Sequence, residues 1–230
     1  DLFQEMEETT KYLYNYNITE YDYLYELMED DTITQARREA LMSDVLRDIL
    51  YMNQHIDHVF FITPGGEQYS VMRPPEVMVK EEEMGRFHEE NFLEGHKQMR
   101  LLPTHDTSYY SDVSDFTVTR NIMNTRTIQS ADEQELGTLY IDVSADYFDG
   151  IINETDLEDG CRMYVIDRKE KVFVYSQEKE NIGTGIGKLE DYLPEMEEDK
   201  QYIKADGNYF IYRLIPGTDW LVTEEIPAFN

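Results

Sequence analysis

The sequence is poor in cysteine, in basic residues and in long apolar runs, and each shortage excludes a class of protein. Cys161 is the one cysteine among 230 residues, so no intrachain disulfide and no cysteine-based zinc site can form. Lys and Arg total 20 against 49 Asp and Glu, which gives a formal net charge of −29. Such an acidic surface repels DNA and RNA, so we expect no nucleic-acid partner. No stretch reaches the ~20 apolar residues of a membrane span, and no signal peptide is visible.

Motifs of catalysis and of cofactor binding are missing as well. No Ser or Cys lies in a Gly-x-Ser-x-Gly context, and no His-Glu-x-x-His spacing exists. The Gly-rich loop 183–187 follows a polar, acidic segment, which favours a plain turn over a phosphate site. His55 and His58 straddle a predicted helix-to-strand junction, so a shared metal-binding face is not indicated. We therefore expect no catalytic residue, no cofactor and no metal ion in this chain.

The sequence does contain enough apolar surface to fold, with a hydrophobic content of 40% and 18 tyrosines. It also repeats itself. An apolar strand, a turn and a second strand read from Val59 to Ser70, and again from Met163 to Ser176. A further strand follows each copy, at Leu136–Val143 and at Trp220–Ile226. A repeated opening hairpin and closing strand predict two related β-rich lobes in tandem.

Helical patterns precede and connect these strands. Residues 2–29 show an apolar stripe with an interruption near 15–19, and residues 35–56 show a cleaner one after a cap at Thr32 or Thr34. Further helices are predicted at 80–96 and 145–152, a loop at 104–114 and a strand at 116–122. The chain begins at Asp1 without Met, inside a helical pattern, so we expect a piece of a longer protein.

Four stretches carry a resemblance to a known family. They are Ile56–Ile62, Phe116–Ile122 preceded by Tyr109 and Tyr110, Gly137–Val143, and a final set made of Tyr164–Ser176, Ile182-Gly183 and Trp220–Pro227. In this order and spacing the chain resembles the extracytoplasmic double Cache domain of bacterial sensor histidine kinases. The resemblance implies an α+β fold, in which a long N-terminal helix precedes two tandem PAS-like lobes, each a central antiparallel sheet flanked by helices. The expected division is 1–57 for N-terminal stalk helices, 58–153 for the membrane-distal lobe and 154–230 for a smaller membrane-proximal lobe.

The resemblance also implies a function. It predicts an extracellular ligand-sensing domain of a membrane-bound histidine kinase, with membrane spans outside this piece and a small molecule bound in the distal lobe. The alternatives are the sensor of a chemoreceptor or other transmembrane signalling protein, and a surface solute-binding module that does not signal. Arg86-Phe87-His88 lacks the Trp-Tyr pair of the family's amino-acid-binding pattern, so no amino-acid ligand is predicted.

Arg120, Tyr109 and Tyr110 are the predicted centre of that ligand pocket. Arg120 alternates in phase with Phe116 and Val118, so its head points toward an apolar interior and needs an anion there. This favours an anionic ligand, and an Arg120→Ala variant would then lose the ligand response. The alternative is an ion pair or a solvated head. The candidate ion-pair partners of Arg120 are Asp112, Asp115 and Asp142, and the further pocket candidates are Phe87, His105 and Asp112.

The apolar stripe on residues 2–29 leaves two arrangements open. The stripe pairs with the same helix of a second chain in a parallel homodimer, or it packs on the chain's own lobes.

Overall fold

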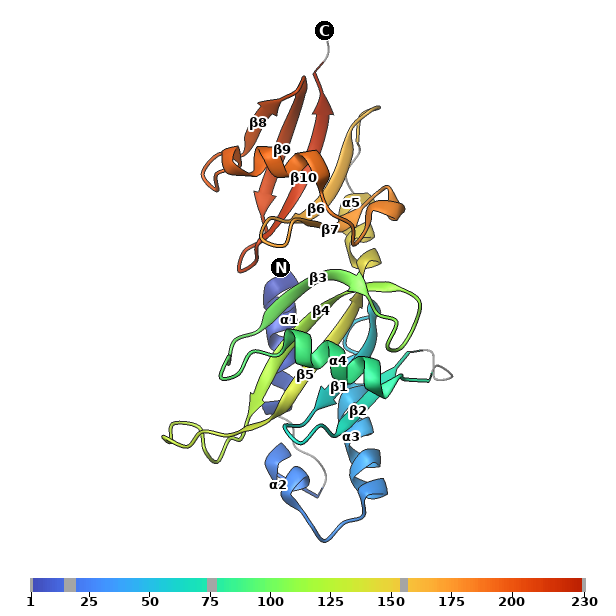
Figure 1. Cartoon of the computed structure of the whole chain (residues 1–230), viewed down its shortest axis with the longest axis vertical. Helices are drawn as coiled ribbons and strands as arrows, with labels where there is room; N and C mark the ends of the chain where they lie inside the picture. The colour runs from blue at the N-terminus through green and yellow to red at the C-terminus, as the bar shows by residue number, and fades with distance from the viewer. Residues whose placement is uncertain (1, 15–19, 74–77, 154–156, 229–230) are drawn as a thin grey trace.

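Two antiparallel five-stranded sheets follow one another along the chain (Figure 1). The computed structural model describes residues 2–14, 20–73, 78–153 and 157–228. The first sheet has the order β2-β1-β5-β4-β3, with β1 Ile56–Ile62, β2 Gln68–Met72, β3 Arg100–Asp106, β4 Ser114–Met123 and β5 Glu135–Ser144. The second has the order β7-β6-β10-β9-β8, with β6 Arg162–Asp167, β7 Val172–Ser176, β8 Tyr202–Ala205, β9 Asn208–Leu214 and β10 Trp220–Pro227. The two orders are the same when the strands are counted from the start of each sheet, so the predicted tandem repeat is confirmed.

The N-terminal segment forms several short helices. They are α1 (Leu2–Lys11), the 3₁₀ turn η1 (Tyr12–Tyr14), α2 (Leu24–Glu29) and α3 (Gln35–Leu50). Helices are present in the first and last parts of the predicted stretch 2–29, but the second helix begins only at Leu24, because residues 20–23 are not helical. The proposed interruption at 15–19 lies outside the described residues. At the end of η1, the Tyr14 hydroxyl donates to the Asn121 carbonyl and accepts from the Met123 amide, so contacts with β4 hold the chain there. Thr34 caps α3 by accepting from the Arg37 amide at 3.1 Å.

α1 and α3 pack on one face of the first sheet. Met6, Val45 and Ile49 are fully buried in the same core as Phe61 and Ile141. Burial of one such side chain stabilises the fold by roughly 1.5–3 kcal/mol. Helices expected to form a stalk therefore share a core with the first sheet.

The apolar stripe of the N-terminal helices is used within the chain. Leu2, Met6 and Leu13 are buried against the chain's own lobes. Of the two arrangements that the sequence left open, the internal one is therefore present, and these side chains are not free to pair with a second chain.

Strand β3 lies in a region where the sequence predicted a loop from residue 104. It contains Pro103, and its pairing with β4 shifts between Leu102 and His105. A proline lacks an amide hydrogen and is tolerated at a bulge of an edge strand. The edge position of β3, which only the sheet order defines, explains why the local pattern was misleading.

A helix covers the remaining face of each sheet (Figure 1). In the first lobe this is α4 (Glu81–Asn91), which ends earlier than the predicted 80–96 because Phe92 adopts an extended conformation. In the second lobe it is the 3₁₀ helix η4 (Gly187–Glu195), whose Leu189, Tyr192 and Leu193 pack on the sheet core. Each helix connects the second and third strands of its sheet, so the repeat includes this element too.

The two lobes meet through η2 (Ala145–Phe148), α5 (Asp149–Asn153) and the edges of both sheets. Thr104 Oγ1 of β3 donates to the Val174 carbonyl of β7 at 2.6 Å in a buried hydrogen bond. Phe116 and Trp220 meet edge to face with ring centroids 5.3 Å apart. The close approach of the second lobe to α1 depends on Gly217, because an added Cβ there would come within 2.8 Å of the Phe3 ring. None of the described helices has the length and apolar character needed to cross a bilayer.

Candidate ligand-binding site

The face of the first sheet that lies beneath α4 carries a buried polar centre. Strand β5 alternates here, so Tyr140 and Asp142 face α4, whereas Leu139, Ile141 and Val143 face the core formed with α1 and α3. An ionised carboxylate in such a position is costly unless donors surround it. Side chains on the two neighbouring strands and in the connection 107–113 surround Asp142.

Asp142 is fully buried and has three polar neighbours. The Tyr109 hydroxyl donates to it at 2.9 Å, and the Thr117 hydroxyl donates at 2.6 Å. His58 Nδ1 lies 2.9 Å from Asp142 Oδ2. The other ring nitrogen of His58, Nε2, is buried and has no hydrogen-bond partner in the described chain. This centre therefore retains a hydrogen-bonding site that the protein does not fill.

Two further carboxyl groups lie next to this centre. Asp115 is buried and accepts a hydrogen bond from the Tyr110 hydroxyl. Burial, reinforced by the negative charge of Asp142, raises the pKa of Asp115 to about 8. Burial likewise raises the pKa of Asp57. Within the described ranges no Lys or Arg forms an ion pair with Asp57, Asp115 or Asp142, so the centre holds more acid than base.

Aromatic rings enclose the polar centre. Tyr110 stacks on His58 with centroids 4.4 Å apart, and Phe60 stacks on Tyr140 at 4.6 Å. Phe87 of α4 lies 5.0 Å from the ring of Tyr109. Rings of this kind present negative faces, which attract cations.

A groove between the two lobes reaches the outer side of this enclosure. Its volume is about 790 Å³, and its walls include Phe87, Arg100 and His105 of the first lobe and Lys169 and Trp220 of the second. Phe87 and His105 stack at 4.8 Å and separate the groove from the polar centre. His105 also contacts that centre, because its Nε2 lies 2.7 Å from Thr117 Oγ1.

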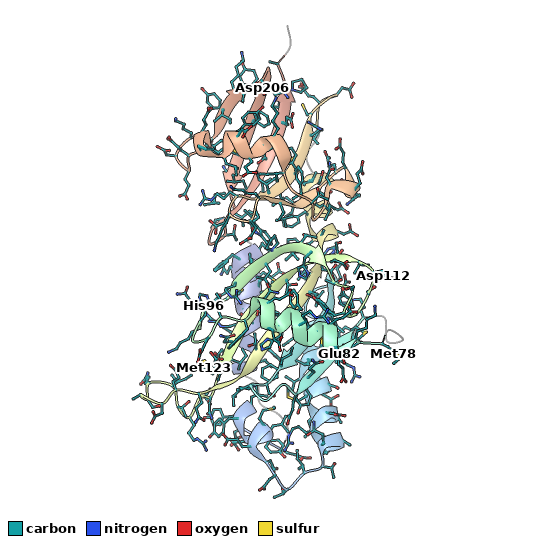
Figure 2. All side chains as sticks on the ribbon, viewed as in Figure 1. Met78, Glu82, His96, Asp112, Met123 and Asp206 are labelled. Atoms are coloured by element: carbon teal, nitrogen blue, oxygen red, sulfur yellow. The ribbon has the colours of Figure 1, made fainter. Side chains whose placement is uncertain are left out.

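The predicted pocket residues divide into two groups. Tyr109, Tyr110, Phe87 and His105 do come together beneath α4. Asp112 is exposed on the loop before β4, at the edge of the lobe where Figure 2 labels it, and no ring contact or hydrogen bond joins it to them within the described chain.

Arg120 lies on the other face of the sheet, toward α1. It pairs there with Glu7 at 3.0 Å and donates to Thr10 Oγ1 at 3.2 Å. The placement of Arg120 beside Tyr109 is therefore wrong, and so are the three aspartates named as its ion-pair partners. The prediction that Arg120 lies on the same face of β4 as Phe116 and Val118 is correct, but α1 covers that face and supplies Glu7 as the ion-pair partner.

The residues that sequence reasoning missed are Asp142 and Asp115 as site residues, together with Thr117, His58 and Arg100. The available signal was an Asp inside the apolar run Leu139–Val143. Arg100 lies in the unpredicted strand β3, is partly buried beside α4 and donates to the Asn91 carbonyl. It forms no salt bridge within the described chain, and burial lowers its pKa.

Comparisons with solved structures define the class of fold. No protein-family model and no curated protein sequence matches the chain. The chain does have the two-lobed fold of bacterial extracellular sensor domains. The extracellular domain of rpHK1S-Z16, described as a histidine kinase, is 16% identical with a TM-score of 0.55, and the match covers 88% of this chain and 90% of that one.

Two chemoreceptor domains of Campylobacter jejuni are also similar in structure. The ligand-binding domain of Tlp3, solved with L-norvaline, is 12% identical with a TM-score of 0.57, over 99% of this chain and 88% of that one. The periplasmic sensory domain of Tlp1 is 9% identical with a TM-score of 0.59, over 98% of this chain and 87% of that one. At these identities the likeness concerns the fold, and it agrees with the double Cache architecture that the sequence predicted.

Proposed function

We propose that this chain is the extracytoplasmic ligand-sensing domain of a membrane-bound sensor histidine kinase. Its ligand is a small molecule with an ammonium group, bound beneath α4 in the first lobe. The chain itself is not catalytic, and the kinase activity belongs to other parts of the parent protein. The two-lobed fold shared with a histidine kinase ectodomain supports the class of protein.

The observation that carries the ligand class is the acid excess of the buried centre. Asp57, Asp115 and Asp142 lie close to the basic side chain of His58, and no Lys or Arg of the described chain forms an ion pair with any of the three. Asp115 keeps its proton at neutral pH, so Asp142 is the group that an ammonium group would meet as an anion. An ammonium group would supply the missing charge and would form charge-assisted hydrogen bonds to Asp142. This replaces the anionic ligand that was predicted on the basis of Arg120. Structurally similar domains solved with L-norvaline and with isoleucine are consistent with such a ligand.

Arg100 adds a second element of recognition. Its side chain lies beside α4. Arg100 pairs with Thr119, which is two residues along β4 from Thr117, the partner of Asp142. Two residues along a strand span roughly 7 Å. A ligand that carries a carboxylate as well as an ammonium group would meet Arg100 and Asp142 together. Phe87 and His105 would move aside to admit it from the groove.

Occupancy of this site would reach the second lobe through β3. His105 contacts Thr117, and the adjacent residue, Thr104, forms the buried hydrogen bond to Val174 of β7. A ligand shifts the balance between two lobe arrangements only by its differential affinity for them. Movement of His105 on binding would create that difference at the lobe contact.

Calorimetric titration of the chain with L-amino acids and with the amines that lack their carboxylate tests this proposal. Asp142→Asn keeps the shape of the side chain and removes its charge, so we expect about 10- to 100-fold weaker binding, the scale of one charged hydrogen bond. Asp112→Asn, on the exposed loop, is the matched control and leaves affinity unchanged. Equal affinity of Asp142→Asn and the parent, or binding of carboxylates without an ammonium group, would contradict the assignment.

Chemoreceptor sensing is the second candidate, because two of the similar structures are chemoreceptor domains. A surface receptor that binds solute without signalling also remains an alternative. The flanking sequence of the intact gene separates them. Apolar spans on both sides and a downstream kinase region support the first proposal, a downstream chemoreceptor signalling region supports the second, and a single anchor supports the third.

A further inference from the structure

The second lobe contains a cavity of about 390 Å³ between its sheet and η4. This volume lies within the range of small-molecule sites. The wall contains aromatic side chains, Tyr164, Phe173 and Tyr192, and charged ones of both signs. The site described above, in the first lobe, does not include any of these residues.

The strand register shows that this cavity corresponds to the polar centre of the first lobe. In the first sheet, rows on the helix-covered face pair Phe60 with Tyr140 and then His58 with Asp142. In the second sheet, the equivalent rows pair Tyr164 with Thr223 and then Arg162 with Glu225. Both lobes therefore place a carboxylate beside a basic side chain at the same position of the repeat: Asp142 beside His58 in the first, and Glu225 beside Arg162 in the second.

The connection between the third and fourth strands decides which of the two spaces is open. In the first lobe this connection is residues 107–113, and its Tyr109 and Tyr110 fill the space over His58. In the second lobe it is the turn Asp206-Gly207, in which φ is +47° and +78°. A two-residue turn of this kind closes a hairpin directly. It brings no aromatic ring over the sheet, and its Asp206 lies in the cavity wall, where it pairs with Lys188 and accepts a hydrogen bond from the Tyr192 hydroxyl. The turn lies at the outer end of the lobe, where Figure 2 labels Asp206.

Glu225 holds the base of the cavity in place. Its side chain is about 10% exposed and accepts from Arg162 at 2.9 Å, from Asn208 at 2.8 Å and from Tyr164 at 3.3 Å. The guanidinium of Arg162 is thereby fixed from its buried side and remains half exposed. Thr223, the strand neighbour of Tyr164, keeps a buried hydroxyl without a hydrogen-bond partner among the described residues.

The second contact of Arg162 is much weaker. Its Nη1 lies 3.6 Å from Glu178, and both side chains are about half exposed. Exposed pairs of this kind contribute only about 0–1 kcal/mol. A molecule with both charges could insert between them, because its carboxylate would meet the planar fork of Arg162 and its ammonium group would meet Glu178.

We propose that the second lobe binds a small zwitterion in this cavity. The carboxylate of the ligand binds Arg162, its ammonium group binds Glu178, and its apolar body packs on Tyr164 and Phe173. A ligand with one charge would form only one of the two contacts and leave the other group of the pair without its partner. This site is independent of the first-lobe site.

The test uses the 230-residue chain with Asp142→Asn, so that binding in the first-lobe site is weakened. The common L-amino acids are titrated calorimetrically, and the best binder is compared with the amine and the carboxylate that each lack one of its charges. For L-valine these are isobutylamine and isovalerate. We expect each analogue to bind at least tenfold more weakly than the zwitterion.

Variants then locate the binding. Arg162→Gln and Glu178→Gln should each weaken it at least tenfold, whereas Arg213→Gln, on the exposed face of β9, should not. Glu178 is half exposed, so Glu178→Gln should leave the fold intact. This variant therefore still tests the proposal if the loss of Arg162 unfolds the lobe. Absence of any binding, a single-charge analogue that binds equally well, or full affinity in Glu178→Gln would each overturn the proposal. The first-lobe proposal is tested separately, by comparing Asp142→Asn with the parent chain, so it can hold even if the second-lobe site fails.

Discussion

Asp115 gives the sharpest test of the electrostatics beneath α4. Its folded-state pKa is about 8, against 3.8 in the absence of the fold, because burial and the neighbouring charge of Asp142 disfavour ionisation. The folded protein therefore keeps a proton that the unfolded chain releases above about pH 4. Its stabilising contribution is complete below the unfolded pKa and is lost as the pH rises through the folded pKa. Between pH 6 and pH 8 the expected loss is about 2 kcal/mol of unfolding free energy.

Asp115→Asn should remove this dependence. The amide imitates the protonated acid, still accepts from the Tyr110 hydroxyl and does not titrate. Urea denaturation of parent and variant at pH 6, 7 and 8 gives the measurement, and the difference between the two proteins cancels the titration of all shared groups. Asp112→Asn, exposed on the preceding loop, should keep the pH dependence of the parent. An equally steep loss of stability in Asp115→Asn would refute the inference that Asp115 is protonated in the fold.

Three further predictions concern the lobe contact and the face toward α1. Gly217→Ala should destabilise the chain more than Gly207→Ala in chemical denaturation. Both positions have a φ of +78°, but only at Gly217 would the new Cβ meet a ring of α1; equal losses would deny the contact. Arg120→Ala should leave ligand affinity unchanged while lowering stability by roughly 1–3 kcal/mol, since it removes the charged hydrogen bonds to Glu7 and Thr10 and leaves Glu7 with Lys11 alone. Lost binding with intact stability would restore the sequence-based prediction. Thr104→Val should cost about 1–3 kcal/mol by leaving a buried β7 carbonyl unpaired, and should weaken signalling in the intact receptor more than ligand binding; unchanged signalling would exclude this contact as the route.

The sequence alone was sufficient for the repeated architecture. Alternating apolar runs bounded by Pro64-Gly-Gly66 and by Asp206-Gly207 predict strands and turns from local chemistry, and those strands are present. The cap at Thr34 follows from the same local rules, because its hydroxyl needs only the amide three residues later. Order and spacing of such elements then indicated the family whose fold the chain shares.

The candidate site depended on contacts that no local pattern contains. Alternation along β4 groups Arg120 with Phe116 and separates it from Thr117, yet it cannot say which face α1 covers and which face α4 covers. For the same reason Asp142 was considered only as a partner of Arg120, although Tyr109, Thr117 and His58 reach it from three other segments. Strand β3 was missed because Pro103 is acceptable only at an edge, and an edge exists only once the sheet is assembled. The sequence thus determined the strands, the turns and the phase of their side chains, whereas the packing of distant segments decided which charges were buried together and which were paired.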